Sequence, residues 1–580
     1  MVTVRSSGAC VLLFAGLLGT ANAFCPTLHS GVFQRALVPC QASQKSAPTS
    51  ASTTTTSRRQ NRVASLLEWA QASQVQIASN LGLNSADGAG LGWWVTAGSG
   101  SSSSSKALTA GQVVLQVPAS LALAVECPGD GPSDSAVAKL LPNNSKLLTQ
   151  QPWFVQMALY LYKIDRVDSS SATTSSTSSS GRAGAANYRP WLDSLPRQFD
   201  TPIHWSASVM EELQYPYLTK QVDRQEQQWK SYYQQLTTAT GSLLSAMSWD
   251  DFLWGCECAR SRAFSGGYTG NAFDPAIYAF TLLLVTAYVG LGLGTAEQAA
   301  NGAGVVVSVF ILRDFVLPKL LKKKIYVICP MIDMANHVSV GAKGEVSFEY
   351  FGNAYSLTIA SGDTVPVQEQ VYISYGSRSN DQLLQYYGFV EKDNPNDVYI
   401  MPPLREWNIE ALEKATGRTF AKGRLQKLDR AGLLGGSLAS ALQTDGDDEG
   451  SSTTFEKAAN LDGGVVVTSV NGVDPAVLQA LRALVSTDQE WKAAGEAVGN
   501  FSEELSGGAE NERCARLAAE AAIEMELARK PTTLEEDEEI LRRLETMKSL
   551  DASPEDKLAL HFRIEKKKLL LATIDKLALK

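Results

Sequence analysis

The stretch from Ile328 to Asp397 limits the fold of this 580-residue chain more than any other part of it. Strand patterning lies around Val327 and again between residues 346 and 374, and a helical pattern resumes at Asp381. Glycines interrupt the segment next to aromatic residues, where the backbone can approach a ligand closely. The segment therefore predicts short strands and a helix brought together around a site.

The composition is that of a folded protein of several domains. At roughly 150 residues per domain, the length suggests about three or four compact units. Apolar residues make up 44% of the chain and charged residues 19%, which excludes a disordered polyelectrolyte and a protein of many membrane spans. The net charge of −9 argues against a protein held mainly by nucleic-acid phosphates.

Histidines and cysteines are too few and too scattered to predict a metal site. The chain has eight cysteines without a CxxC pair, and its four histidines are His29, His204, His337 and His561. A histidine-built metal site, a zinc cluster and a disulfide framework are therefore not expected. The same cysteine usage favours a reducing compartment.

The N-terminal residues have the pattern of a targeting leader. An apolar run, Val11–Leu18, follows Arg5, and small residues then suit cleavage of a signal peptide after residue 23. Residues 24–62 are rich in Ser and Thr, basic and free of acidic residues, which is the composition of a transit peptide.

Together the two leader segments resemble the bipartite presequence of proteins imported into secondary plastids. Such leaders carry Phe directly after the signal cleavage site, and Phe24 occupies that place. The resemblance implies a plastid protein. The alternative is secretion with a disordered polar arm, against which the low cysteine count argues.

Helices and strands alternate along the rest of the chain. Helical patterns are expected over residues 61–78, 153–163 and 206–264 and through most of the last third, and strands over residues 91–95 and 112–118. Segments rich in Ser, Thr or acidic residues, at 99–105, 169–181 and 444–454, are too polar to pack and are expected to be loops.

One uncharged segment departs from the chemistry of a soluble surface. Ala276–Ala296 has 21 residues without a charge, about the length that a bilayer core requires. The shorter apolar run Gly302–Leu312 follows it, and lysines occupy positions 322–324. The two runs predict a hydrophobic hairpin inserted at about residues 272–324, in contact with a membrane and with lysines at the interface. The alternative is a hairpin that is buried or faces a partner.

Two strings within the Ile328–Asp397 stretch resemble SET-domain methyltransferases. They are CPMIDMANH (Cys329–His337) and QVYISYGSRSNDQLLQYYGFVEKDNPND (Gln370–Asp397), and they are most similar to the branch typified by the Rubisco large-subunit lysine methyltransferase. The other strings that carry the resemblance are GLGWWV (Gly90–Val95), NYRPWLDSLPRQFDTPIHW (Asn187–Trp205), WDDFLWGCECARSRAF (Trp249–Phe264), PTTLEEDEEIL (Pro531–Leu541) and KLALHFRIEKKKLLL (Lys557–Leu571).

The resemblance implies an α+β fold. It implies a split SET domain of small β-sheets with a pseudoknot-like core over residues 63–395, a helical insert at about 145–255, and an all-α substrate-binding domain over residues 396–580. It also implies S-adenosyl-L-methionine as the cofactor and a lysine-bearing protein as the substrate.

Methyl transfer to lysine requires a neutral amine in line with a methyl group carried on a sulfonium. Free lysine has a pKa near 10.4 and is mostly protonated, so apolar or aromatic walls must favour its neutral form. Tyr375 and Tyr387, each followed by a glycine, would supply such walls and a hydroxyl. By resemblance, Tyr375 stands at the transfer centre, Tyr387 lines the lysine channel, and Tyr386 is expected to pack elsewhere.

The resemblance also implies residues that bind cofactor and substrate. Those implied for the cofactor are Gly90, Leu91, Arg262, Asn336 and His337, and those implied for the substrate are Arg262, Asp333, Tyr375 and Tyr387. The planar donor fork of arginine suits the cofactor carboxylate, and a carboxylate at position 333 would attract the incoming ammonium. Without the motifs, Arg262 would more often be a surface arginine and His337 a core histidine, and the alternative for Asp333 is a turn or cap carboxylate.

Two departures from the family pattern stand out. Relatives often carry an acidic residue before the Gly90 motif, where this chain has Ala89. The sequence therefore does not decide whether the motif contacts the cofactor. The hydrophobic hairpin interrupts the usual run from SRAF to IDMANH. Loops tolerate insertions while core strands stay paired, so catalysis is expected to survive it.

The acidic run LEEDEEILRRLETMK (Leu534–Lys548) has acids leading and bases following along a predicted helix. Such a pattern usually indicates a solvated helix face. An acidic groove for a partly basic substrate is the alternative.

The sequence thus predicts a plastid protein-lysine N-methyltransferase, with the Rubisco large subunit or aldolase as substrates suggested at the level of the family. One alternative is methylation of a protein histidine. A second is a non-catalytic SET-like scaffold held at a plastid membrane. Histone methylation in the nucleus is disfavoured by the leader and by the absence of flanking cysteine clusters.

Overall fold

A computed structural model describes residues 52–86, 90–96, 107–126, 147–148, 150–167, 188–238, 246–267, 275–311, 324–349, 352–434, 464–505, 508–546 and 552–579. The chain divides into a leading unit, residues 1–57, and one compact unit, residues 58–580. The expected signal peptide, most of the transit-like segment and the three polar loops lie outside the described residues.

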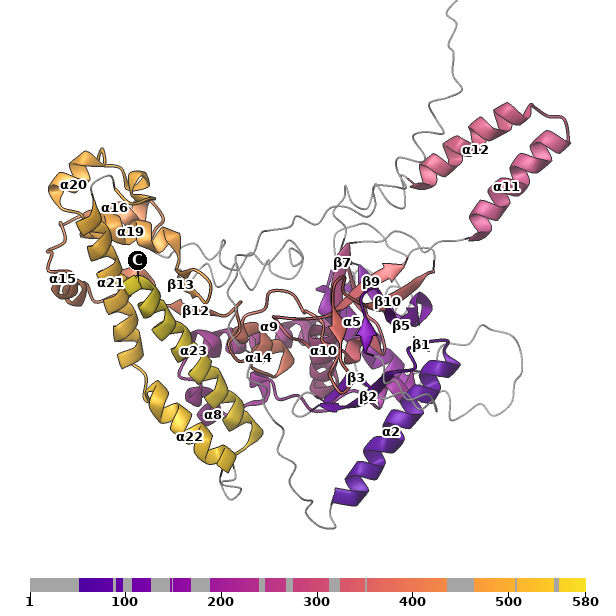
Figure 1. Cartoon of the computed structure of the whole chain (residues 1–580), viewed down its shortest axis with the longest axis horizontal. Coiled ribbons are helices and arrows are strands. Elements are labelled where there is room, and N and C mark those ends of the chain that lie inside the picture. Colours follow the sequence, from indigo (N-terminus) through magenta and orange to yellow (C-terminus); the bar gives the residue numbers. More distant parts are fainter. Residues whose placement is uncertain are drawn as a thin grey trace, which may run out of the picture. The chain divides into compact units, whose positions relative to one another are not determined.

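Small antiparallel sheets form the predicted SET region (Figure 1). The four-stranded sheet has the order β1 (Gln76–Ile77), β5 (Val113–Pro118), β10 (Ala354–Ile359) and β9 (Gly344–Glu349). In the others, β2 (Leu81–Ala86) pairs with β3 (Gly90–Val95), β4 (Leu108–Thr109) with β11 (Thr364–Val365), and β8 (Lys324–Ile328) lies between β6 (Leu123–Glu126) and β7 (Phe264–Gly267). Three of these sheets pair strands that are distant in sequence, so they depend on long-range contacts, whereas β2 and β3 form a local hairpin.

The helical insert packs on these sheets through its aromatic residues. Its helices are α5 (Trp153–Tyr162), α7 (Arg189–Leu192), α8 (Ala207–Glu212), α9 (Pro216–Thr238) and α10 (Trp249–Arg262). The Trp153 ring stacks on the Tyr326 ring of β8, with the ring centres 4.1 Å apart and the planes 1° from parallel. A capping box of Ser248 and Asp251 fixes the start of α10, which ends at Arg262.

The first helix differs from the sequence prediction. A helix was expected over residues 61–78, but α2 spans Ser52–Ala72 and the chain then pairs as β1. Gln76 and Ile77 face Gln116 and Leu115 of β5. The apolar spacing near Val75 fitted a helix, but its side chain is buried in the core shared with β5, and pairing with that strand takes precedence over local propensity.

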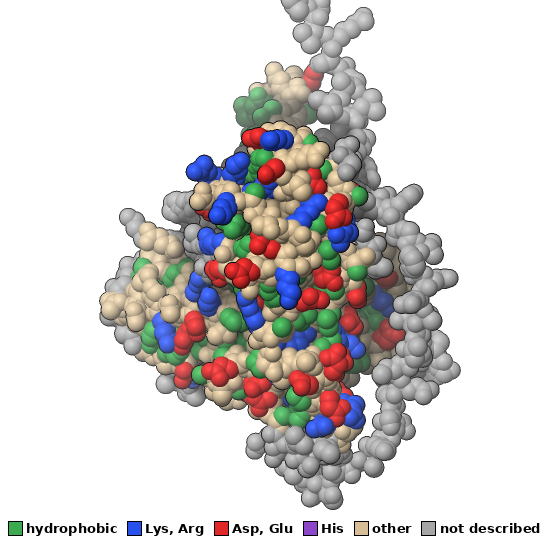
Figure 2. All heavy atoms as spheres, turned by 90° about the vertical axis from the view of Figure 1, so that its left-hand side faces the viewer, with side chains coloured by type: hydrophobic (Ala, Val, Ile, Leu, Met, Phe, Trp, Pro, Cys, Tyr) green, Lys and Arg blue, Asp and Glu red, His purple; other side chains and the backbone are tan. Residues whose placement is uncertain are grey.

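The C-terminal region is mostly helical but not all-α as expected. Its helices are α15 (Ile409–Thr416), α16 (Arg424–Arg430), α19 (Pro475–Val485), α20 (Asp488–Ala493), α21 (Ala509–Ala528), α22 (Leu534–Thr546) and α23 (Pro554–Leu579). A sheet of β12 (Val398–Met401), β13 (Val465–Thr468) and β14 (Gly472–Val473) joins them, because the buried valine run of β13 suits a strand. On the face in Figure 2, acidic and basic side chains are interspersed.

The hydrophobic segment forms the predicted hairpin of two helices, α11 (Pro275–Gly290) and α12 (Ala296–Ile311), as Figure 1 shows. Its large apolar side chains are exposed: Phe280, Leu282, Leu283, Leu284, Tyr288, Val289, Leu291, Leu293, Val305, Val306 and Val309. Within the described part of the chain, no helix has both the length and the apolar character needed to cross a membrane.

The structure has two hydrophobic cores, and the short helix α14 (Asn380–Tyr387) contributes to the second. The first core unites the SET sheets with α5 and α10, and the second unites the C-terminal helices with β12 and β13. Leu384 of α14 lies in the second core, together with Leu218 and Val222 of α9. Residues of the helical insert and of α14 thus belong structurally to the C-terminal core as well.

Candidate active site

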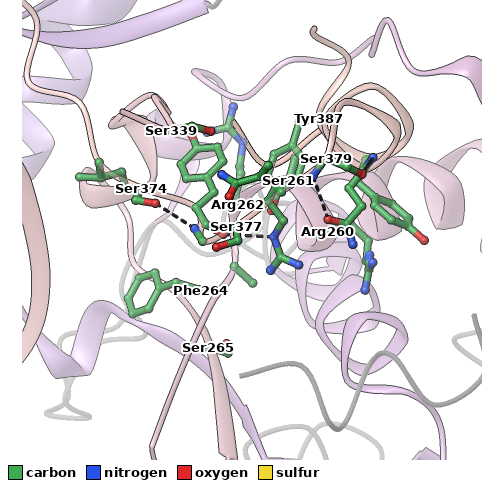
Figure 3. A pocket seen from close by; sticks show the side chains of 18 of the residues that line it. Arg260, Ser261, Arg262, Phe264, Ser265, Ser339, Ser374, Ser377, Ser379 and Tyr387 are labelled. Carbon is green, nitrogen blue, oxygen red and sulfur yellow. Dashed lines mark hydrogen bonds between the residues drawn. The ribbon is translucent and has the colours of Figure 1, made fainter. Parts of the chain in front are cut away.

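A pocket of about 820 Å³ opens where α10, α14 and the strand-like segment 373–376 meet. Four of the predicted site residues line it: Arg262, Asp333, Tyr375 and Tyr387. Figure 3 shows Arg262 and Tyr387 among its labelled side chains. Tyr386, expected to pack elsewhere, lines the pocket too, because its ring lies against the Arg260 guanidinium at 4.0 Å.

Tyr375 is held in a stack of three rings. Its ring centre lies 5.1 Å from that of Tyr387 and 4.9 Å from that of His337, with planes 25° and 19° from parallel. The Tyr375 hydroxyl donates a hydrogen bond of 2.9 Å to the Ala335 carbonyl. Burial raises the pKa of Tyr375, so the phenol stays neutral and acts as a hydrogen-bonding group rather than a base.

Three chain segments cross beside this stack and bring the predicted strings together. The Val371 amide donates to the Trp93 carbonyl at 2.8 Å, and the Ile373 amide donates to the Asn336 carbonyl at 2.9 Å. The Trp93 indole also donates to the carbonyl of Met331, whose φ of 74° is unusual for a residue other than glycine. The backbone strain at Met331 thus sits beside the site and is held by Trp93.

Arg262 and Asp333 form a pair at the pocket wall. Arg262 Nη1 lies 3.2 Å from Asp333 Oδ2, and the Trp191 indole donates to both carboxylate oxygens at 3.2 and 3.3 Å. The Asp333 side chain is fully buried, which raises the pKa of its carboxyl group. The negative charge of Asp333, expected to attract the substrate ammonium, is therefore paired with Arg262. Trp191, which sequence reasoning missed, holds the carboxylate through its indole hydrogen bonds.

The second predicted string meets the glycine motif at Asn336. Asn336 Nδ2 donates to the Leu91 carbonyl at 3.3 Å. A Cβ placed on Gly92 would lie 2.0 Å from Gln370 Nε2 and 2.8 Å from Asn336 Nδ2, so only glycine fits there without displacement. Gln370 Nε2 is buried without a hydrogen-bond partner. Gln370, which begins the second string, therefore packs against the glycine motif, a contact that no spacing rule identifies.

The His337 side chain is occupied by protein groups. Its Nδ1 accepts a hydrogen bond from the Tyr375 amide at 3.0 Å, and its Nε2 lies 3.2 Å from Ser339 Oγ and 3.7 Å from Glu391 Oε2. Burial lowers the pKa of His337, consistent with a neutral ring that accepts from the Tyr375 amide. Its side chain orders the Tyr375 loop, and any contact of this residue with the predicted cofactor would fall to its backbone.

The structure thus brings seven of the eight predicted site residues into two connected groups, and Gly90 is the exception. Tyr375, Tyr387, Arg262 and Asp333 line the pocket, while Asn336 and His337 join Tyr375 to the Gly90–Leu91 strand. Gly90 itself is exposed at the start of β3. Among the described residues, no group of three or more His, Cys, Asp or Glu side chains could hold a metal ion.

Comparisons with known proteins concern the fold and the C-terminal region. The family described as Rubisco LSMT substrate-binding matches residues 417–570. A solved structure of the SET domain of LSMT bound to lysine and AdoHcy is 18% identical, covering 90% of this chain and 92% of that chain with a TM-score of 0.51. A structure of Rubisco LSMT bound to AdoMet is 19% identical, covering 89% and 92%, also with a TM-score of 0.51.

A search among curated proteins found no match. At these identities the likeness to the solved structures concerns the fold, and the matched domain lies within the predicted substrate-binding region. The fold predicted from the strings around Asn336 and Tyr375 is confirmed: the chain has the fold of the solved SET-domain LSMT structures, and residues 417–570 match the family described as Rubisco LSMT substrate-binding.

Proposed function

We propose that this protein is an S-adenosyl-L-methionine-dependent protein-lysine N-methyltransferase that acts on a plastid protein. The observation that carries the proposal is the stack of Tyr375 on Tyr387 at the wall of a pocket, next to the paired Arg262 and Asp333. Structures of LSMT with lysine and with AdoMet share this fold, which supports the same substrate class and cofactor here.

The pocket residues suit an acceptor amine that must be neutral. Two stacked tyrosine rings lower the local polarity, which disfavours an ammonium and favours the free amine. Asp333 lies in the same wall, but Arg262 balances its charge, so the Asp333 carboxylate is not free to stabilise the protonated form. Tyr375 keeps its proton and fixes the Ala335 carbonyl, so both groups are preorganised before substrate enters.

Two buried donors, one beside Gly92 and one at the pocket wall, fit the cofactor. Gln370 Nε2 and Arg262 Nε are buried donors without hydrogen-bond partners, which are groups that a polar ligand would satisfy. Asn336 and the Leu91 backbone would hold the cofactor beside them. When bound, S-adenosylmethionine supplies the methyl group on a cationic sulfonium.

Gly92→Ala is expected to weaken cofactor binding by roughly tenfold, about 1.4 kcal/mol. The new Cβ would overlap Gln370 Nε2 at 2.0 Å and displace the side-chain amides of Gln370 and Asn336, which lie beside Gly92. Isothermal titration calorimetry with S-adenosylmethionine measures the effect. Gly499→Ala is the matched control, because a Cβ there meets no atom within 4 Å. Equal affinities for both variants would place the cofactor elsewhere.

Transfer of a labelled methyl group to proteins of a plastid extract tests the function directly. A labelled band that requires active enzyme would establish the activity and supply the substrate for mapping, including the distinction between lysine and histidine. No band together with no calorimetric cofactor binding would support the scaffold alternative. No band with tight cofactor binding would exclude the proteins of that extract as substrates.

The plastid location rests on the leader composition of residues 1–62. A fluorescent protein fused behind these residues should accumulate in plastids of an alga with secondary plastids. Fluorescence in the nucleus or the medium would overturn this part of the proposal.

We also propose that the hairpin α11–α12 binds the surface of a plastid membrane. Consecutive residues Leu282, Leu283 and Leu284 are 65%, 62% and 53% exposed, so exposed apolar side chains cover about 200° of the circumference of α11, more than one stripe. A groove on a protein would cover only one stripe of such a helix, whereas lipid surrounds it. A helix of 16 residues is about 24 Å long, which is shorter than the hydrocarbon core of about 30 Å, so the hairpin would enter the bilayer without crossing it.

Replacing Leu282, Leu283 and Leu284 with glutamine should abolish sedimentation with phosphatidylcholine–phosphatidylglycerol vesicles. Each buried leucine contributes about 1.5–3 kcal/mol, and glutamine keeps helix propensity. Val340→Gln is the control, because Val340 is 70% exposed outside the hairpin. Wild-type protein that stays in the supernatant would contradict membrane binding.

A further inference from the structure

Lys566 is a buried cation that belongs to the C-terminal domain but contacts the active-site helix. It lies on α23 and is 3% exposed. Its Nζ donates to Asp381 Oδ2 at 2.5 Å, to Asp397 Oδ1 at 2.8 Å and to the Val398 carbonyl at 2.6 Å. These three bonds use every proton of the ammonium group.

Both carboxylates contact the first turn of α14, one as a residue of the helix and the other through hydrogen bonds. Asp381 is the second residue of that helix and also lines the pocket. Asp397 accepts hydrogen bonds from the Asn380 amide at 2.9 Å and from Asn380 Nδ2 at 3.2 Å. The ammonium of Lys566 therefore joins α23 to the start of α14 through two carboxylates.

The far end of α14 is the wall of the predicted lysine channel. The helix has eight residues and ends at Tyr387, whose ring stacks on Tyr375. Gly388 closes it in the left-handed conformation at φ 74°. Because two helical turns move as one body, a shift at Asp381 would move Tyr387 as well.

Asn380 carries a second connection from the same anchor to Tyr375. Its side chain donates to the Glu391 carbonyl at 3.0 Å and accepts from the Glu391 amide at 2.9 Å. Glu391 in turn accepts from the Ser339 amide at 2.7 Å, next to His337. The anchor at α14 is thus continuous with the hydrogen bonds that hold the Tyr375 loop.

We propose that Lys566 is a positioning residue, which couples the substrate-binding domain to the active site by fixing α14 so that Tyr387 lies against Tyr375. Its effect on turnover rests on the proposed methyltransferase function, but its effect on α14 does not. Removing Lys566 leaves two buried carboxylates without their shared cation, and they would separate the start of α14 from α23.

The experiment measures hydrogen exchange and methyl transfer on the full-length protein. Lys566→Met and the double variant K566M/D381N loosen the anchor, and the double variant is expected to fold because it removes one cation and one anion together. Lys566→Arg restores the cation. Lys568→Met is the matched control, since Lys568 lies on the same helix and is 33% exposed.

In the loosened variants, exchange over residues 380–388 should rise by roughly tenfold or more, because breaking a buried pair is costly. Exchange in α21 should stay unchanged, which shows that the domain remains folded. Unchanged exchange over 380–388 in the double variant, or an equal rise in Lys568→Met, would overturn the proposal.

Methyl transfer to free lysine separates positioning from substrate grip, because free lysine makes no use of a protein-binding surface. We expect kcat to fall by roughly tenfold to a hundredfold, KM for lysine to change less, and Lys566→Arg to recover most of the loss. A higher KM for lysine with an unchanged kcat would overturn the positioning role. A wild type that transfers no methyl group would contradict the proposed function, while the exchange measurement would still decide the role of Lys566.

Discussion

Tyr375→Phe is expected to fold normally and to lose methyl transfer by roughly a hundredfold, within the range for losing one preorganised hydrogen-bonding group. The change deletes only the hydroxyl, which donates to the Ala335 carbonyl at 2.9 Å. The ring remains, and so does its stacking on His337 and Tyr387. The backbone amide that donates to His337 is also unaffected, so the loop keeps its anchor.

The measurement is initial-rate transfer of labelled methyl groups to the band identified in the plastid extract. Calorimetric titration of the same variant should show cofactor affinity close to wild type, because the Asn336–Leu91 contact lies outside the change. Tyr372→Phe is the matched control: Tyr372 precedes Tyr375 by three residues and does not line the pocket. Wild-type rates in Tyr375→Phe would remove this hydroxyl from the chemistry.

Much of the fold could be predicted because its determinants are local strings. The two strings around Asn336 and Tyr375 form the segments that cross beside the pocket. The structure places these two segments in contact through the Ile373–Asn336 hydrogen bond. The hairpin and the helical insert also follow from apolar and amphipathic patterns. The short strands β13 and β14 were missed because the strand signal of two to four residues is weak within a helical region.

The partners of site residues could not be predicted in the same way. Trp191 contacts Asp333 across 142 positions, and Lys566 contacts Asp381 across 185. No periodicity links residues so far apart. Lys566 also belongs to a run of three lysines, a pattern that usually indicates a solvated face, yet Lys566 and Lys567 are both 3% exposed.

The acidic run of α22 shows the same difference between pattern and structure. Its order, with acids leading and bases following, predicted a solvated face, and most of its side chains are exposed or partly exposed. Asp537 is the exception, with a side chain that is fully buried. It accepts hydrogen bonds from Arg563 Nε at 3.0 Å, from Thr532 Oγ1 at 2.8 Å and from Lys567.

Asp537→Ala is therefore expected to lower the free energy of unfolding by about 3–5 kcal/mol, because it leaves two buried cations without their carboxylate. Arg563 is 6% exposed, and Lys567, also buried, already has a pKa lowered by burial. Urea unfolding followed by tryptophan fluorescence measures the change.

Glu538→Ala is the control for helix propensity and net charge, since Glu538 is the next residue and its side chain is 51% exposed. The free energy of unfolding of that variant should lie within about 0.5 kcal/mol of the wild-type value. The free energy of unfolding of Asp537→Asn should lie between those of Asp537→Ala and Glu538→Ala. The amide keeps an acceptor oxygen but loses the charge that balances Arg563 and Lys567. Equal midpoints for Asp537→Ala and Glu538→Ala would mean that water replaces the carboxylate at no cost, and that α22 is held to α23 by its apolar contacts alone.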